Sequence, residues 1–510
     1  MEVHASVGAE LTARAVSLPP PVGGWNTLDA LADMPPDHAV TLDNWFPNAD
    51  RVSVRRGFTA WSTGYPAAVE TLMPYVPPSG TAKLFAAAGG GIYDATGSGA
   101  VGAAMLSGRT NARWQWAQMN TAGGHFLFVC NGADTPQTWD GSTWANTTIT
   151  GPTVANLAWV NVHQRRLWVG EVNSLRGWYL APNAIGGAAN FFDFTGLASL
   201  GGSIIAMGTW TRDGGSGPDD LAVFMTSEGE ALIYAGTDPA TLGAWQLVGI
   251  FRLGRPLGRR CMIRAGADLI VMTDQGFVAL SDVLPVDRSQ QAVAAVSRQI
   301  NPSVVAAARN FSSSFGWQAF IYPSSNMLIF NVPATAGAYE QYVFNTLTRA
   351  PCRFTGMNAR CWGLLNDRAF FGGSNAVFLS DTGTTDNGAS IQATAVQAFN
   401  KFGSAAQKKA FKGCQVVLQS EAAPAVGVDM IMDYRMTTPP PATGTPPSAI
   451  ALWDVRLWDQ ALWAGEAIFD QQRGVRGIGR VAAVRVVSSS RIARPSWIGT
   501  NVRFIPGGVL

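Results

Sequence analysis

The sequence predicts an all-β protein whose main part is a β-propeller of about seven blades, within a range of six to eight. Short apolar runs joined by Gly- or Asn-containing turns recur from about residue 80 onward, at intervals of roughly 40 to 55 residues, the length of a four-stranded blade. The 510 residues are 47% hydrophobic and only 14% charged, so the chain can fill several packed sheets. A β-sandwich or several small barrels is the alternative, because hairpins alone do not fix how sheets stack.

The first 58 residues predict an N-terminal arm that ends in a strand. Residues 19–24, Pro-Pro-Pro-Val-Gly-Gly, cannot be helical and indicate an extended lead-in. Polar and apolar side chains then alternate over Arg51–Phe58, as in a half-buried strand. We therefore place the first region at residues 1–58, as an arm that could reach neighbouring subunits.

Residues 59–388 are assigned to the propeller, because seven predicted hairpins fall within them. Each hairpin combines an apolar run, a turn and a second apolar run. They cover residues 83–93, 125–139, 166–180, 221–234, 268–280, 318–332 and 368–379. Helix is expected only as an insertion between blades, near Ser289–Gln299 and continuing over Pro302–Arg309, where Ala and Gln are frequent.

The last region, residues 389–510, predicts a small β-sandwich-like domain that completes the ring or contacts neighbours. Polar turn residues at Asp381–Gly388 end the repeats. Polar and apolar residues alternate again at residues 414–419, 426–434 and 481–487, and the low-complexity loop Thr437–Ser448 interrupts them.

Composition excludes several classes of function. The net charge of +2 lacks the concentrated positive charge of a dedicated DNA-binding domain. The five cysteines are scattered and never spaced Cys-x-x-Cys, and there are only four histidines, so neither a disulfide scaffold nor a zinc site is expected. The first residues lack a signal-peptide pattern, and no apolar run is long enough to span a bilayer. We expect a soluble protein made in the cytosol, without metal or cofactor.

No catalytic or cofactor-binding residue is predicted. Gly97–Gly102 matches Gly-x-Gly-x-x-Gly, but no long helix follows to direct its N-terminus at a pyrophosphate. Thr138–Trp144 is one residue short of the Asp-box turn of sialidase-like propellers, and we expect an ordinary hairpin turn at Asp140-Gly141.

Pairs of carboxylates could divide acid and base roles in a glycosidase, although such residues in hairpin loops are usually solvated. The pairs are Asp219 with Asp220 and Glu228 with Glu230. The densest charge feature is Arg252–Arg264, which holds five Arg in 14 residues when counted from Phe251, without an acidic residue. This run could face DNA or a neighbouring subunit, and the sequence leaves both open.

Several short motifs, taken in order, resemble tail nozzle proteins of short-tailed phages. These are the proteins related to the tail tubular protein B of T7-like phages and to the packaged-DNA stabilisation protein of P22-like phages. The motifs lie at residues 21–27, 32–47, 54–58, 84–88, 92–93, 131–132, 139 and 504–508.

The resemblance implies a homohexameric ring below the portal and the adaptor protein, in the tail of a virion assembled in the bacterial cytoplasm. Such a ring extends the head-to-tail channel, helps retain double-stranded DNA without sequence-specific binding, and conducts it during ejection. Tail fibres or tailspikes and the host outer membrane are further expected contacts, and Asp213–Asp220 and Thr437–Ser448 are candidate gating loops. The resemblance supplies no catalytic residue. A glycan-cleaving, sialidase-like propeller or a glycan-binding lectin is the alternative.

Overall fold

The computed structural model describes residues 12–211, 220–241, 243–287, 290–335, 337–442 and 467–509, which form mainly β-strands. The all-β class is confirmed. The chain forms two compact units. The propeller unit comprises residues 58–346 and 355–382, and the sandwich unit comprises residues 1–57, 347–354 and 383–510. This division differs from the expected regions 1–58, 59–388 and 389–510, because the N-terminal residues belong to the same unit as the C-terminal strands.

Five separate antiparallel sheets of three or four strands lie wholly within the propeller unit. They are β7–β9 (Val69–Tyr75, Lys83–Ala88, Gly91–Asp94); β11–β14 (Gln115–Thr121, Gly124–Cys130, Gln137–Trp139, Trp144–Asn146); β16, β17, β18 and β20 (Leu157–His163, Arg166–Glu171, Arg176–Tyr179, Asn190–Asp193); β21–β24 (Ile204–Thr211, Asp220–Thr226, Glu230–Gly236, Trp245–Arg252); and β25–β27 (Met262–Ala265, Asp268–Thr273, Gly276–Ala279).

Two further groups of strands in this unit are parts of larger sheets. One is β28–β30 (Gln318–Tyr322, Met327–Thr335, Ala338–Asn345), and the other is β32–β34 (Cys361–Leu365, Arg368–Gly372, Ala376–Ser380) with β6 (Phe58–Thr63). The short strands β10 (Gly99–Ala100), β15 (Ile149–Thr150) and β19 (Gly187–Ala188) make two-residue parallel pairs. Five separate sheets are fewer than the blade number of about seven that the spacing of the repeats predicts.

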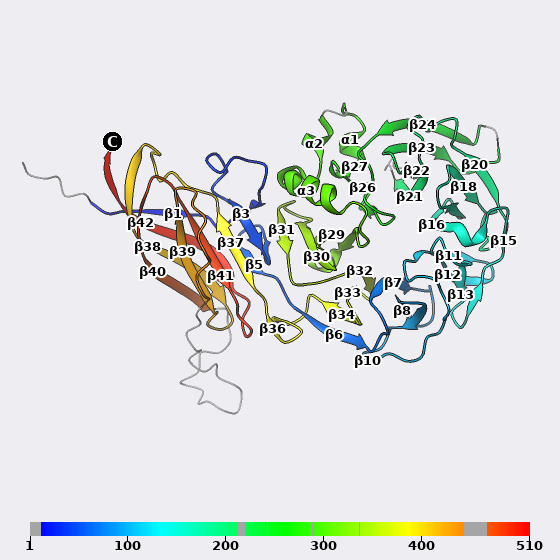
Figure 1. Cartoon of the computed structure of the whole chain (residues 1–510), viewed down its shortest axis with the longest axis horizontal. Helices are drawn as coiled ribbons and strands as arrows, with labels where there is room; N and C mark the ends of the chain where they lie inside the picture. The colour runs from blue at the N-terminus through cyan, green and yellow to red at the C-terminus, as the bar shows by residue number, and fades with distance from the viewer. Residues whose placement is uncertain are drawn as a thin grey trace, which may run out of the picture. The chain divides into compact units, whose positions relative to one another are not determined.

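The sheets are arranged in a closed ring, as in a β-propeller (Figure 1). Each group of strands contributes its first strand to the ring. These first strands contact one another in the order β11, β16, β21, β25, β28, β32, β7. Thr71 in β7 joins the ring to the segment before β11, because its Oγ1 donates to the Ala112 carbonyl oxygen at 2.6 Å and accepts from the Trp114 amide at 3.1 Å. β6 from the start of the unit pairs with β34 near its end, which fastens the ring.

All seven predicted hairpins are present as antiparallel strand pairs. Adjacent sheets pack their apolar faces together, for example through Trp168 and Phe224, whose ring centroids lie 5.3 Å apart. The hairpin turn at Gly229 needs a glycine, because its φ is +90° and an added Cβ would lie 2.8 Å from the Gly254 carbonyl oxygen.

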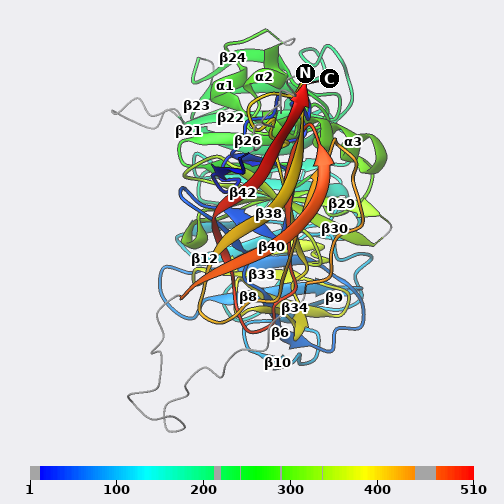
Figure 2. The same ribbon diagram turned by 90° about the vertical axis from the view of Figure 1, so that its left-hand side faces the viewer.

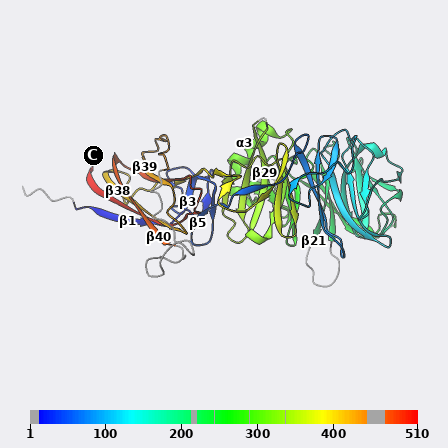
Figure 3. The same ribbon diagram turned by 90° about the horizontal axis from the view of Figure 1, so that it is seen from below.

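The helical insertion lies between β27 and β28 but differs in detail from the prediction. It contains α1 (Leu280–Val283), α2 (Gln291–Ala294), a 3₁₀ turn η3 (Arg298–Ile300) and α3 (Asn301–Phe311). The expected helix over Ser289–Gln299 is interrupted because buried Ala295 has extended backbone, and Ser289 lies outside the described residues. The longest helix is α3, which starts with Pro302 in its first turn and lies at a rim of the ring (Figure 3).

The sandwich unit contains two layers of strands. One layer has the order β4, β5, β42, β38, β40 (Trp45–Pro47, Val52–Val54, Ser496–Val509, Gln407–Ser420, Ala467–Gly479), and β1 (Arg14–Leu18) also pairs with β42. The other has the order β31, β3, β37, β41, β39 (Pro351–Phe354, His38–Asp43, Ala393–Gln397, Ala482–Ser488, Val426–Met432), with β2 (Gly24–Trp25) beside β3. Figure 2 shows the long strands β42, β38 and β40 side by side. The strands expected near residues 414, 426 and 481 are confirmed.

The described part of the predicted N-terminal arm is built into the sandwich unit instead of extending from it. β1 and β5 pair with β42, and β3 pairs with β37. The strand expected over Arg51–Phe58 is broken, because β5 ends at Val54 and β6 begins at Phe58. Arg55 turns inward to a buried ion pair with Asp386, and a Cβ on Gly57 would lie 1.9 Å from the Thr385 carbonyl oxygen. The chain can therefore not continue as one strand there.

Candidate functional site

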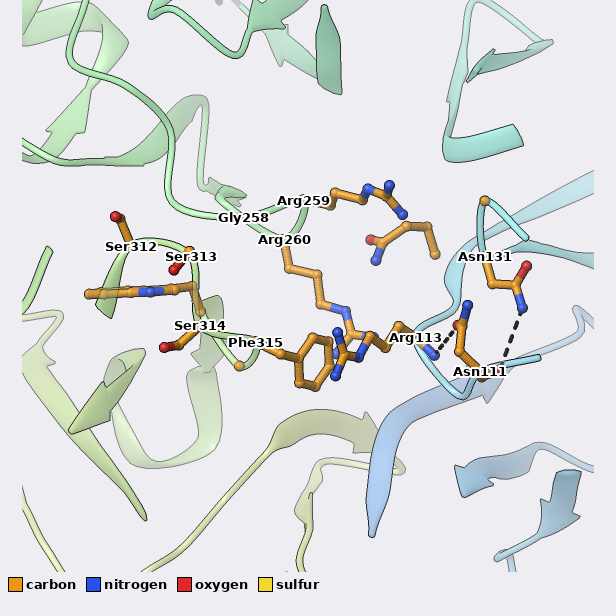
Figure 4. A pocket seen from close by; sticks show the side chains of 14 residues that line it. Asn111, Arg113, Asn131, Gly258, Arg259, Arg260, Ser312, Ser313, Ser314 and Phe315 are labelled. Atoms are coloured by element: carbon orange, nitrogen blue, oxygen red, sulfur yellow. Dashed lines mark hydrogen bonds between the residues drawn. The ribbon is translucent and has the colours of Figure 1, made fainter. Parts of the chain in front are cut away.

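A cavity in the propeller unit has a volume of about 390 Å³ and is lined largely by arginine, asparagine and serine. Its lining comes from segments at residues 111–115, 131–132, 258–260 and 312–317, which precede or follow strands of different sheets. Arg113, Arg259 and Arg260 line it from two of these segments, and Figure 4 shows Arg113 and Arg260 meeting beside Phe315 while Arg259 extends separately, toward the side of Asn131. We call this cavity, with these three arginines and Phe315, the arginine pocket.

Arg260 is fixed in place by hydrogen bonds that cross the ring. Its Nη1 donates to the Glu70 carbonyl oxygen at 3.0 Å, and its Nη2 donates to Thr71 Oγ1 at 2.6 Å and to the Trp114 carbonyl oxygen at 3.0 Å. Burial lowers the pKa of Arg260 from the usual value of an arginine, but a guanidinium remains charged at neutral pH.

Arg113 and Arg260 both lie over the ring of Phe315, with guanidinium carbons 4.6 and 5.4 Å from its centroid. These distances are within the range of cation–π attraction. Arg113 also approaches the Glu70 carboxylate at 3.4 Å, and its side chain is 53% exposed, so this ion pair is weak. Phe315 therefore holds two like charges close together in one wall of the pocket.

Arg259 differs from the other two because it makes no hydrogen bond or ion pair with any described residue of the chain. Its Nη1 lies next to Gly132, where an added Cβ would be 3.3 Å away, and Gly132 has a φ of +76°. Burial lowers the pKa of Arg259, and the charge of Arg113 lowers it further. Three arginines line the pocket, and Glu70 is the only described residue whose carboxylate forms an ion pair with one of them.

The arginine run Arg252–Arg264 does not form one continuous surface. Arg252 donates to Ser199 Oγ at 3.2 Å, and Arg255 forms an ion pair with Glu228 at 2.7 Å. Arg264 donates to the Gly266 carbonyl oxygen at 3.2 Å. Only Arg259 and Arg260 enter the pocket, and whether the remaining arginines face DNA or a subunit stays a prediction. Sequence reasoning missed Arg113, because no local signal connects it with residues that follow it so much later in the chain.

Asp140 is a turn residue, as expected from the sequence. Its Oδ1 accepts from the amides of Ser142 and Thr143, each at 2.7 Å, and from Ser142 Oγ at 2.8 Å, while Oδ2 accepts from Thr143 Oγ1 at 3.2 Å. These hydrogen bonds lower the pKa of Asp140 to about 2, and the bond from the Thr143 amide contributes most. The carboxylate therefore stabilises the turn between β13 and β14.

The predicted carboxylate pairs do not act together. Glu228 pairs with Arg255, whereas buried Glu230 accepts from the Leu200 amide at 2.9 Å and from Ser199 Oγ. Asp220 accepts from Thr211 Oγ1 at 2.5 Å, and Asp219 lies outside the described residues. Each described carboxylate thus has its own structural partner.

The remaining expectations concern short motifs and isolated residues. Gly97–Gly102 contains the two-residue strand β10 and precedes no helix, as predicted. All five cysteines are buried and unpaired, and burial raises the pKa of Cys130 to about 12, so its thiol is a poor nucleophile.

No group of three or more potential metal ligands occurs among the described residues. None of the described helices is long and apolar enough to cross a membrane. Of the candidate gating loops, residues 213–219 and 443–448 lie outside the described part of the chain.

Comparison with known proteins identifies no family. No protein-family model matches the chain, and no curated protein matches it. Among solved structures, the chain is similar to BBS1N in complex with ARL6DN (12% identity, TM-score 0.42, covering 65% of this chain and 99% of that one). It is also similar to Sqt1 of Saccharomyces cerevisiae and to the computationally designed Ika8 protein, each at 10% identity and covering 67% of this chain and 96% of the other, with TM-scores of 0.38 and 0.36. All three scores are too low to carry any conclusion about function.

Proposed function

We propose that this chain is a structural subunit of a phage tail, a ring-forming nozzle that extends the head-to-tail channel, helps retain packaged DNA and conducts it during ejection. The ordered motifs of the sequence support the family, and a sheet edge in the sandwich unit that no described strand covers supports assembly into a ring. The partners in this proposal are further copies of the chain, expected as a hexamer, the adaptor protein, and tail fibres or tailspikes. DNA passes without sequence-specific binding, and the distal end contacts the host outer membrane.

The observation that carries the assembly is strand β40. It is the last strand of its layer and pairs only with β38 among the described residues. Two of its apolar side chains, Ile468 and Ile478, are 69% and 72% exposed. A long open edge with exposed isoleucines favours pairing with another chain, and soluble proteins usually blunt such edges. We infer that β40 contacts a neighbouring copy.

The proposed propeller has seven blades. Five are the separate sheets, and the other two are β28–β30 and β32–β34 with β6. The support for this count is that each of the seven groups supplies one first strand to the closed ring of contacts, and that each group contains one of the seven predicted hairpins.

A substitution on β40, with a control in a loop of the same unit, tests the proposed assembly. Ile478→Lys places a charge on the open edge and should weaken ring formation, because a desolvated lysine at an interface is unfavourable. Ile492→Lys is the matched control, because Ile492 is also exposed and belongs to the same unit but lies in a loop. Particle mass is measured by light scattering with and without the adaptor. If both variants assemble like the unmodified chain, β40 is not the contact.

A further inference from the structure

We propose that the arginine pocket of the propeller unit binds the phosphate group of a small ligand. This inference does not depend on the nozzle function. It rests on three features of the pocket: its excess of positive charge, a guanidinium that pairs with no described residue, and walls that are fixed before any ligand arrives.

The positive charge of the pocket favours a ligand that carries two negative charges. Arg113, Arg259 and Arg260 line the pocket, and among the residues that the structure describes only Glu70 brings a carboxylate to them, 3.4 Å from Arg113. Two positive charges therefore remain uncompensated by described residues. A phosphate group carries a charge of about −1.5 to −2 at neutral pH, so it balances them better than a single carboxylate would.

Arg259 supplies the free donors. Its guanidinium is held beside Gly132, is half-buried, and has no protein acceptor among the described residues. A partly buried cation without a counterion is unfavourable, and a planar fork of N–H donors suits phosphate oxygens. The ligand would thus take the place of the missing ion-pair partner.

The surrounding walls are preorganised. Arg260 is held by its bonds to the Glu70 and Trp114 carbonyl oxygens and to Thr71, and Phe315 packs against both Arg113 and Arg260. Ser312, Ser313 and Ser314, from the segment after α3, also line the cavity, on the side away from the three arginines (Figure 4). A site whose side chains are already fixed loses little conformational entropy on binding.

The volume limits the size of the ligand. A cavity of about 390 Å³ lies near the lower end of the range for small-molecule sites. It accommodates inorganic phosphate or a small phosphate ester. A DNA duplex does not fit inside it.

Calorimetric titration of the full-length protein tests the proposal, with inorganic phosphate and adenosine monophosphate as probes at constant ionic strength. Saturable binding of either probe is expected, and Arg259→Gln should weaken it at least tenfold, about 1.4 kcal/mol. Arg264→Gln is the matched control, because Arg264 belongs to the same run but its one bond within the described part of the chain is to Gly266 in an exposed turn. This variant should bind like the unmodified chain.

The two probes distinguish the source of the phosphate. Equal affinities indicate free phosphate, and tighter binding of the nucleotide indicates a phosphate ester whose remainder also contacts the pocket. Arg259→Lys provides a second variant that keeps the charge, and it should retain more affinity than Arg259→Gln. Absence of saturable binding, equal binding by Arg259→Gln, or equal binding of acetate would overturn the proposal.

Discussion

Replacing Arg55 by methionine should destabilise the sandwich unit by about 3–5 kcal/mol, because it breaks a buried ion pair from one side. The Arg55 side chain is 1% exposed and that of Asp386 is 13% exposed. The guanidinium donates to both oxygens of Asp386, at 2.8 and 2.6 Å, and its Nε donates to Asn44 Oδ1 at 2.8 Å. Methionine leaves the Asp386 charge and the Asn44 oxygen without these donors.

The expected loss of stability comes from leaving the Asp386 carboxylate and the Asn44 oxygen without donors, and not from the strength of the ion pair itself. Removing both partners, as in Arg55→Met with Asp386→Leu, should therefore recover much of the loss, since no buried charge remains. The double substitution also separates the cost of the stranded carboxylate from the cost of changed packing.

Hydrogen exchange followed by mass spectrometry measures the effect within one unit. A loss of about 4 kcal/mol corresponds to a fall of roughly a thousandfold in the protection of the slowest amides of β5 and β42. Peptides from the propeller unit serve as an internal reference in the same sample. A fall of less than tenfold in β5 and β42 would refute the reasoning that Arg55 anchors the N-terminal segment within the sandwich unit.

Three further predictions follow from single residues of the propeller unit. Burial lowers the pKa of His163 to about 4, so between pH 6.5 and 4 the unfolded chain binds a proton that the folded chain does not. The free energy of unfolding should therefore decrease by up to about 3 kcal/mol as the pH is lowered from 6.5 to 4. In urea unfolding, His163→Gln should lack this pH-dependent loss of stability. Asp140→Ala should destabilise the protein by about 1 kcal/mol at pH 7, because it removes hydrogen bonds of the turn. The folded-state pKa of about 2 lies below the usual value, so the stability difference between the variant and the unmodified chain should persist down to about pH 4 and vanish as the pH falls through 2. Thermal melts at several pH values measure it. Gly170→Ala should lower the yield of folded protein, because its Cβ would lie 2.1 Å from the Trp159 ring; a melting temperature equal to that of the unmodified chain would contradict this clash.

The hairpins could be predicted because both of their strands and the turn between them lie within one short stretch of sequence. The run around Gly229, for example, contains two apolar strands and the glycine that its left-handed turn requires. The position of the helix could be predicted less well, because buried Ala295 adopts extended backbone despite its high helix propensity. Tertiary packing overrides propensity there.

Pairings between distant parts of the chain left no local signal. Arg14–Leu18 pairs with the last strand of the chain, and Phe58–Thr63 pairs with Ala376–Ser380, and neither partner can be recognised from periodicity alone. The arginine pocket likewise combines residues that lie far apart in the sequence. Arg259 and Arg260 stand out in the sequence as part of a basic run, but Arg113 joins them only because the ring brings different sheets together.

The central claim is that this chain forms a ring in a phage tail. The most direct test is the mass and symmetry of the purified full-length protein, alone and bound to the adaptor ring, by light scattering and single-particle imaging. The account predicts a six-fold ring, either in solution or formed on the adaptor. A monomer that ignores the adaptor would contradict it, and glycan binding or cleavage by that monomer would favour the sialidase-like or lectin alternative.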